Sequence, residues 1–273
     1  MSNVCVYQIY YDEPSRARLD PAFIPWDNTR NERPDWAEYW SFRSVWHHCR
    51  AGLRESDYLG IFSPRFTEKT GLTGELVTRR VIESQADVIS FSPYLTHIAV
   101  YANVFEQGER YHPGLIDALS KAMQVLDEPL EWNEIIGTFR NTIFSNYFVA
   151  RVKVWDDLMK WTERLFEICE RDDTELARQL NDGVRYVRGP ATMKVFVFER
   201  LISLLLWKRS YKAHLGMDFQ EWRKIKCVTD GQYSALLSLD ALKSQFLETG
   251  RSEYLEQFFS ARTSLFSANL NMS

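Results

Sequence analysis

Residues 57–66 read Asp-Tyr-Leu-Gly-Ile-Phe-Ser-Pro-Arg-Phe, and residues 87–94 read Asp-Val-Ile-Ser-Phe-Ser-Pro-Tyr. Each contains an apolar run of the length of a buried strand, and each run is stopped by the same Ser-Pro pair, since proline ends a hydrogen-bonded ladder. A helix is expected between them, over 74–85. Strands that alternate with helices in this way indicate an α/β layered domain with a mostly parallel sheet flanked by helices.

The rest of the chain continues this alternation. A β-branched and aromatic first strand is expected over 4–11, followed by a long loop over 12–34 that contains four prolines. Asp35 and Glu38 have the spacing of a capping box, which predicts that a helix starts there. A further strand is expected over 143–149, and helices over 114–126, 154–170, 199–211 and, split near Gly250, in the last fifty residues. We expect one domain over 1–215 and a helical extension over 216–273.

The composition is that of a folded, mildly acidic protein. The chain has 273 residues, 45% of them hydrophobic and 26% charged, with a formal net charge of -4. These values exclude a disordered or fibrous chain, and they argue against nucleic acid as a partner because a polyanion attracts basic proteins. Aromatic residues are abundant, with 9 Trp, 13 Tyr and 17 Phe. They indicate either a well-filled core or a cleft that stacks rings against a flat ligand.

The cysteines and the N-terminal residues suggest a cytoplasmic protein. The four cysteines, Cys5, Cys49, Cys169 and Cys227, are widely spaced, as expected for reduced thiols. The first residues do not form a basic, apolar leader, and the longest apolar run, 201–207, is too short to span a membrane. We therefore expect a cytoplasmic location, with peripheral contact at the inner membrane as an alternative. No metal site is expected, since His47, His48 and Cys49 would point in different directions from a helix.

Two basic residues follow the strand over 57–62. Ligands of open α/β sheets bind at the carboxyl ends of the strands, where Arg65 and Lys69 are expected. A guanidinium and an ammonium beside Gly71 suit a phosphate or diphosphate group. The alternative is that both are solvated loop charges.

Two other segments carry polar groups that could contact a ligand. Residues 103–114 contain Glu106, Glu109 and His112 and are expected to lack regular structure after Gly108, as a ligand-facing loop or a surface turn. Glu199 and Arg200 lie in an apolar neighbourhood, where an unpaired carboxylate is costly. Glu199 is therefore expected either to start a helix or to face a cleft as a general base.

Three motifs recur in an order that resembles a known family. They are Tyr58–Phe66, Ser145–Arg151 followed by a Trp-rich helix to Glu170, and Phe198–Leu201. Together, over about residues 36 to 215, they resemble a bacterial glycosyltransferase family found with capsule and O-antigen synthesis. The resemblance implies a GT-A-like, Rossmann-like fold and the transfer of a sugar from a nucleotide-diphosphate donor to a glycan hydroxyl, by inversion.

The resemblance also implies roles for individual residues. Glu199 matches the glutamate of the family's Glu-Arg-Leu motif and is expected to remove the acceptor hydroxyl's proton. Arg65, Lys69, Asn146 and Arg200 are expected to bind the donor, a UDP-sugar above others, and Glu106, Glu109 and His112 to bind the acceptor. The Asp-x-Asp pair that presents a divalent cation in GT-A folds is absent, so Arg65 and Lys69 are expected to balance the diphosphate charge instead.

Two alternatives remain open at this point. The chain could be a non-catalytic carbohydrate-binding or scaffold domain of a polysaccharide assembly system, as the aromatic content and the absent Asp-x-Asp pair suggest. The C-terminal helices carry an apolar stripe, made of Phe246, Leu247, Leu255, Phe258 and Phe259. We expect this stripe to pack on the domain's own core, with a homodimer or a membrane-surface contact as the alternatives.

Overall fold

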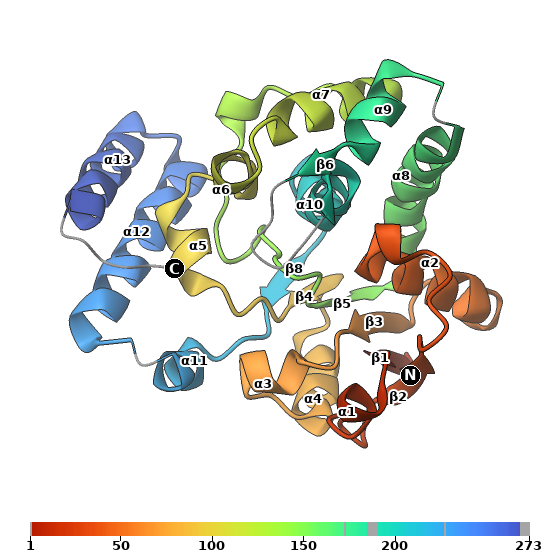
Figure 1. Cartoon of the computed structure of the whole chain (residues 1–273). Helices are drawn as coiled ribbons and strands as arrows, with labels where there is room; N and C mark the ends of the chain where they lie inside the picture. Colours follow the sequence, from red (N-terminus) through yellow and green to blue (C-terminus); the bar gives the residue numbers. More distant parts are fainter. Residues whose placement is uncertain (1, 172, 185–190, 227, 268–273) are drawn as a thin grey trace.

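The fold is built around a six-stranded sheet with the strand order β2-β1-β3-β5-β4-β8 (Figure 1). It is described from a computed structural model that covers residues 2–171, 173–184, 191–226 and 228–267. β1 is parallel to β2 and β3, β4 is parallel to β8, and β5 runs antiparallel between β3 and β4. The strands are β1 Val4–Tyr10, β2 Ile24–Asp27, β3 Tyr58–Phe62, β4 Val88–Ser90, β5 Phe148–Arg151 and β8 Ala213–Leu215.

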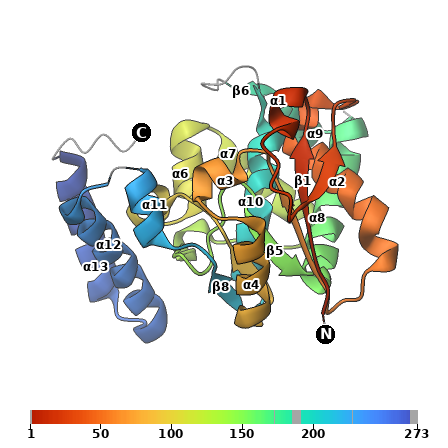
Figure 2. The same ribbon diagram turned by 90° about the horizontal axis from the view of Figure 1, so that it is seen from below.

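All strands except β5 therefore point in one direction, which confirms the expected mostly parallel α/β sheet. We call the edge where these strands end, and where β5 begins, the carboxyl edge. Figure 2 shows β1 and β2 side by side, pointing away from the N-terminus. In sheets of this kind the carboxyl edge is where ligands bind, because the connections that leave the strands form a crevice there.

Helices cover both faces of the sheet. Successive side chains of a strand point to opposite faces of the sheet. Leu59 and Ile61 of β3 therefore pack in one core, with α2, α8 and α10. Tyr58 and Phe62 pack in the other core, with α4 and α12. The helices are α1 Glu13–Arg16, α2 Glu38–Cys49, α3 Phe66–Thr70, α4 Gly74–Ser84, α5 Leu95–Val100, α6 Val104–Tyr111, α7 Leu115–Val125, α8 Val152–Arg171, α9 Glu175–Asn181, α10 Met193–Lys208, α11 Phe219–Ile225, α12 Asp230–Thr249 and α13 Ser252–Ser267. Short 3-10 turns lie at Pro34–Trp36, Arg50–Gly52 and Trp132–Glu134, and β6 Gly183–Val184 pairs with β7 Ala191–Thr192.

Five predicted elements differ from the structure. The strand expected over 143–149 begins only at Phe148 and ends at Arg151, because a turn occupies the residues before it, and the helix expected over 199–211 spans Met193–Lys208. The expected loop over 12–34 contains α1, capped by Asp12, and the edge strand β2. Asp35 lies in a 3-10 turn and does not cap α2. Residues 104–111 form α6 despite Gly108, because Asn103 caps the helix. A Cβ at Gly108 would lie 2.2 Å from Leu115 Cδ2 and 2.5 Å from Arg200 Nε, so the glycine allows α6 to pack closely.

The C-terminal helices pack on the domain through part of the predicted stripe. α12 and α13 lie together beside α5 (Figure 1). Lys243 of α12 is buried and donates hydrogen bonds to the carbonyls of Ile98 and Tyr101. Phe258 is fully buried, whereas Leu247 and Phe259 are 46% and 40% exposed. The boundary at residue 215 and the homodimer remain predictions. Within the described ranges, every helix is too short or too polar to cross a membrane.

Candidate functional site

A strained turn enters β5 at the carboxyl edge. Ser145 and Asn146 have φ angles of 56° and 52°, the left-handed region that L-residues rarely adopt. Hydrogen bonds on both sides hold the turn: the Ser92 hydroxyl contacts the backbone of Phe144, and the Ser203 hydroxyl accepts from the Ile143 amide at 2.9 Å. Two successive strained residues kept in place by neighbouring elements are typical of a functional site.

Glu199 reaches this turn from α10. Its Oε1 accepts a hydrogen bond from the Ser145 amide at 3.0 Å, and its Oε2 lies 3.6 Å from Arg200 NH1. The side chain is 28% exposed. Because α10 begins at Met193, Glu199 lies in its second turn rather than at its start, so the helix's first amides are not its partners. The carboxylate therefore lies at the carboxyl edge, next to Asn146.

Arg65 and Lys69 lie on the neighbouring connection, from β3 into α3. Arg65 pairs with Glu68 at 2.6 Å, and their side chains are 41% and 51% exposed. The Lys69 ammonium lies 5.3 Å from the centre of the Tyr147 ring. Tyr147 follows Asn146, so Lys69 contacts the ring of the residue directly after the turn that Glu199 holds; this ring packs with Phe62 and Phe66.

Tyr147 links these groups to a residue that the sequence reasoning missed. Its buried hydroxyl is 2.5 Å from Ser63 Oγ. Burial raises the pKa of Tyr147, and the nearby Glu38 carboxylate raises it further, while Arg65 lowers it. Glu38, at the start of α2, therefore places a second carboxylate near the carboxyl edge. The sequence showed it only as part of the supposed capping box.

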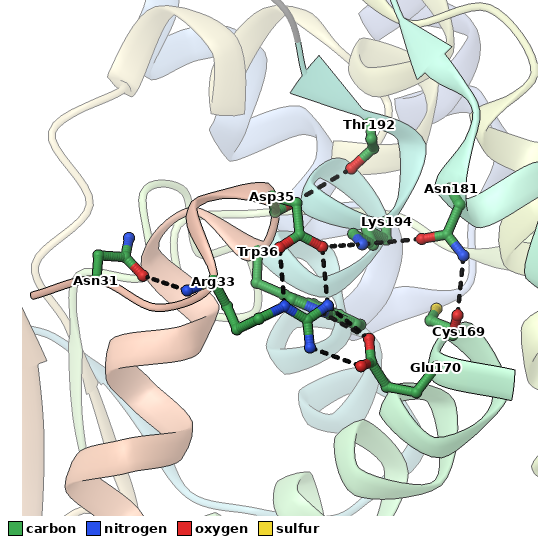
Figure 3. A network of polar contacts seen from close by, with 9 residues as sticks. All are labelled: Asn31, Arg33, Asp35, Trp36, Cys169, Glu170, Asn181, Thr192 and Lys194. Atoms are coloured by element: carbon green, nitrogen blue, oxygen red, sulfur yellow. Dashed lines mark hydrogen bonds and ion pairs between the residues drawn. The ribbon is translucent and has the colours of Figure 1, made fainter.

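A polar network anchors the segment that leads to Glu38 (Figure 3). Lys194 of α10 is 3% exposed and donates to Asp35 Oδ2 at 2.6 Å and to Asn181 Oδ1 at 2.8 Å. Arg33 forms paired bonds with Asp35 and with Glu170. Asp35 therefore makes these contacts and does not cap a helix. Burial raises the pKa of its carboxyl, but the hydrogen bonds and charges of Arg33 and Lys194 outweigh burial and lower the pKa overall. The network fixes the chain just before α2.

Arg200 lies inside the protein and not at the donor side of the edge. It is 2% exposed and donates to the Val104 and Phe196 carbonyls at 3.2 and 2.8 Å and to Gln107 Oε1 at 3.0 Å. These bonds join α10 to α6. The donor-binding role expected for Arg200 therefore finds no support in its surroundings.

The three residues expected at the acceptor side also make internal contacts. Glu106 accepts from the Ala102 amide and pairs with Arg262 of α13. Glu109 accepts from the amides of Gly114 and Ile116, both at 2.8 Å, at the start of α7. His112 is buried against the Phe196 ring, with centroids 3.5 Å apart, and burial and Arg200 lower its pKa to about 4. These three residues join helices and are not part of the site described above.

A surface hollow lies at the opposite edge of the sheet. It measures about 560 Å³ and is lined mainly by charged side chains, among them Glu55, Lys153, Asp156 and Lys160. Glu55 precedes β3 and Lys153 follows β5, so the hollow is remote from the carboxyl edge. Among the residues that the structure describes, no three His, Cys, Asp or Glu side chains are arranged to hold a metal ion.

Compared with known proteins, the chain matches no protein-family model, no curated protein and no solved structure. The resemblance to glycosyltransferases therefore depends on the three motifs alone. The candidate site consists of Arg65, Lys69, Asn146 and Glu199, on the carboxyl edge of a mostly parallel α/β sheet, with Glu38 near Tyr147.

Proposed function

We propose that this chain is a glycosyltransferase that transfers a sugar from a nucleotide-diphosphate donor to a glycan hydroxyl in bacterial surface polysaccharide synthesis. One observation carries the proposal. Arg65 and Lys69 from β3–α3, Asn146 from the left-handed turn, and Glu199 from α10 lie along one edge through the contacts Lys69–Tyr147 and Ser145–Glu199. This edge presents cations, an amide and a carboxylate where α/β sheets bind ligands.

The cations suit the donor diphosphate. The Arg65–Glu68 pair is exposed, and exposed pairs contribute little stability, about 0–1 kcal/mol. A diphosphate can therefore replace Glu68 as the partner of Arg65 at small cost, and form two parallel hydrogen bonds with its guanidinium. Lys69 adds a second positive charge nearby. The replacement of a divalent cation by these two groups remains part of the proposal.

Glu199 suits the role of general base. In an inverting transfer the acceptor oxygen attacks the anomeric carbon, the bond from that carbon to the diphosphate breaks, and the acceptor's proton passes to the carboxylate. Glu199 Oε1 is fixed by the Ser145 amide, while the partly exposed carboxylate still borders solvent. A positioned base of this kind contributes about 10²–10⁴ to the rate.

A non-catalytic carbohydrate-binding protein is the second candidate. The observation that favours it is the Ser145–Glu199 hydrogen bond itself, because a carboxylate that holds a strained turn is explained without any chemistry. In this alternative, glycan binds to the protein and nucleotide sugars do not.

The test is release of nucleoside diphosphate from UDP- and GDP-sugars in the presence of methyl glycosides as acceptors. We expect release with at least one donor, loss of turnover in Glu199→Gln, and unchanged donor binding in that variant. Glutamine is a sharp test because its carbonyl oxygen can still accept from the Ser145 amide. Glu83→Ala, an exposed glutamate of α4, is the matched control. Full activity of Glu199→Gln would refute its role as base, and the absence of any donor binding would refute the proposed function.

A further inference from the structure

Three aromatic rings lie in a row beside the proposed site. Tyr94 and His97 have ring centroids 5.6 Å apart at an interplanar angle of 30°, and His97 and Tyr111 lie 6.0 Å apart at 19°. Tyr94 and His97 come from the start of α5, immediately after β4, and Tyr111 ends α6. We call these three residues the aromatic row.

Contacts connect the aromatic row to the turn and to α10. Ser145 Oγ donates to the Tyr94 hydroxyl at 3.4 Å, and the Ser145 amide donates to Glu199. Gln107 joins His97 Nδ1 at 3.4 Å and also accepts from Arg200 at 3.0 Å. The row therefore adjoins the turn that Glu199 holds, and it comes from α5 and α6, whereas Arg65 and Lys69 come from the β3–α3 connection.

The row is partly open to solvent. Tyr111 is 47% exposed, and Tyr94 and His97 are half-buried. A large exposed ring beside other aromatic rings is a surface on which a ligand can stack. The Tyr101 ring also packs against the Tyr111 ring edge-to-face, with centroids 6.5 Å apart.

The chemistry of the row fits an uncharged sugar. A pyranose has an apolar face of C–H groups and a rim of hydroxyls, so it needs an aromatic surface with a few polar groups at its margin. The Tyr94 hydroxyl and Ser145 Oγ supply such groups, while the buried Gln107 amide is used to hold His97 and Arg200. Burial and the Arg200 charge lower the pKa of His97 to about 4, so its imidazole is uncharged at neutral pH.

We infer that the aromatic row of Tyr94, His97 and Tyr111 binds the acceptor, as a platform for an uncharged pyranose ring next to Glu199. The identification of the bound sugar as the acceptor rests on the proposed function, but the sugar-binding surface can be tested independently of that function. It also assigns the acceptor side to residues other than Glu106, Glu109 and His112, whose groups make internal contacts.

The test is saturation-transfer NMR with methyl glycosides of glucose, galactose, rhamnose and N-acetylglucosamine. At least one should receive saturation from the wild-type protein. The signal should be strongly reduced in Tyr111→Ala, with an affinity decrease of about tenfold, the effect of one good stacking contact. Tyr111→Phe keeps the ring and should keep the signal. Phe259→Ala removes a similarly exposed ring from α13 and should also leave the signal unchanged.

The outcomes separate the two proposals. A glycoside signal that is undiminished in Tyr111→Ala, or its absence from the wild-type protein, would overturn the aromatic platform. A wild-type protein that binds UDP but no glycoside would leave the glycosyltransferase proposal standing and refute the platform alone. A protein that binds glycosides through Tyr111 and binds neither UDP nor GDP would support the platform and refute the glycosyltransferase. If Tyr111→Ala does not fold, Tyr111→Leu, which retains apolar bulk without a ring, gives the same test.

Discussion

Replacing Glu199 by alanine should destabilise the protein through one hydrogen bond. Glu199 Oε1 accepts from the Ser145 amide at 3.0 Å, and that amide belongs to a turn with two left-handed residues. A hydrogen bond to a charged group contributes about 1.5–3 kcal/mol. The carboxylate is 28% exposed, so water can partly replace it as the partner of the amide. We therefore expect the free energy of unfolding to fall by about 2 kcal/mol, in the lower half of this range.

The magnitude can be measured by thermal and urea unfolding. A loss of about 2 kcal/mol lowers the melting temperature of a domain of this size by about 4 °C. Glu199→Gln should lose about 1 kcal/mol, since its neutral oxygen still accepts the bond. Native-state hydrogen exchange should show faster exchange of the Ser145 amide in Glu199→Ala than in Glu199→Gln.

Glu83→Ala is the control, with an expected change within about 0.5 kcal/mol, as for ordinary surface substitutions. If Glu199→Ala were as stable as Glu83→Ala and its Ser145 amide were equally protected, the contact that places Glu199 at the carboxyl edge would not exist. The reasoning for the whole site would then be wrong.

Three further results are expected. Asn146→Gly should unfold thermally with a stability within about 0.5 kcal/mol of the wild-type protein, because glycine adopts a φ of 52° without strain. Its turnover should fall at least about tenfold, because the side-chain amide is lost. Full turnover in this variant would show that Asn146 is not part of the site. Lys194→Ala should lower the free energy of unfolding in urea by about 2 kcal/mol, because it removes the buried cation that pairs with the half-exposed Asp35. An unchanged urea midpoint would show that the network does not anchor the segment before α2. His97, whose pKa is lowered from 6.5 to about 4, should contribute stability that is present above about pH 6.5 and lost as the pH falls toward 4, because the unfolded chain takes up the proton first. In His97→Gln, the urea midpoint should change less with pH across this window than in the wild-type protein. His112 adds a similar pH dependence to both proteins. An equal slope of midpoint against pH in the two proteins would contradict the low pKa of His97.

The strands β3 and β4 could be predicted because their sequences are almost uniformly apolar, whereas the central strand β5 was expected five residues too early. β3 is buried along its whole length, and the Ser-Pro pairs after β3 and β4 correctly marked where the strands end. From this the position of Arg65 and Lys69 at the carboxyl edge followed. Gly250 likewise ends α12 in the left-handed conformation expected of a C-terminal glycine.

Other elements could not be predicted because contacts distant in sequence decide them. β2 is an exposed edge strand without an alternating pattern, so the four prolines of residues 12–34 suggested a loop. The run Met193–Phe198 is β-branched and aromatic, yet it is helical because α10 is buried on nearly all sides. The partner of Glu199 is a backbone amide 54 residues away, and the partners of Arg200 lie on α6 and α10. No local pattern contains this information.

Calorimetric titration of the full chain with UDP and with GDP tests the central claim most directly. The account predicts binding of at least one of them to the wild-type protein, weakened about a hundredfold in the double variant Arg65→Gln/Lys69→Met, at about tenfold for each cation removed. Lys160→Met, which removes an exposed lysine of α8, should bind like the wild-type protein. Equal affinity of the double variant and the wild-type protein, or no affinity in either, would contradict a diphosphate site at this edge of the sheet.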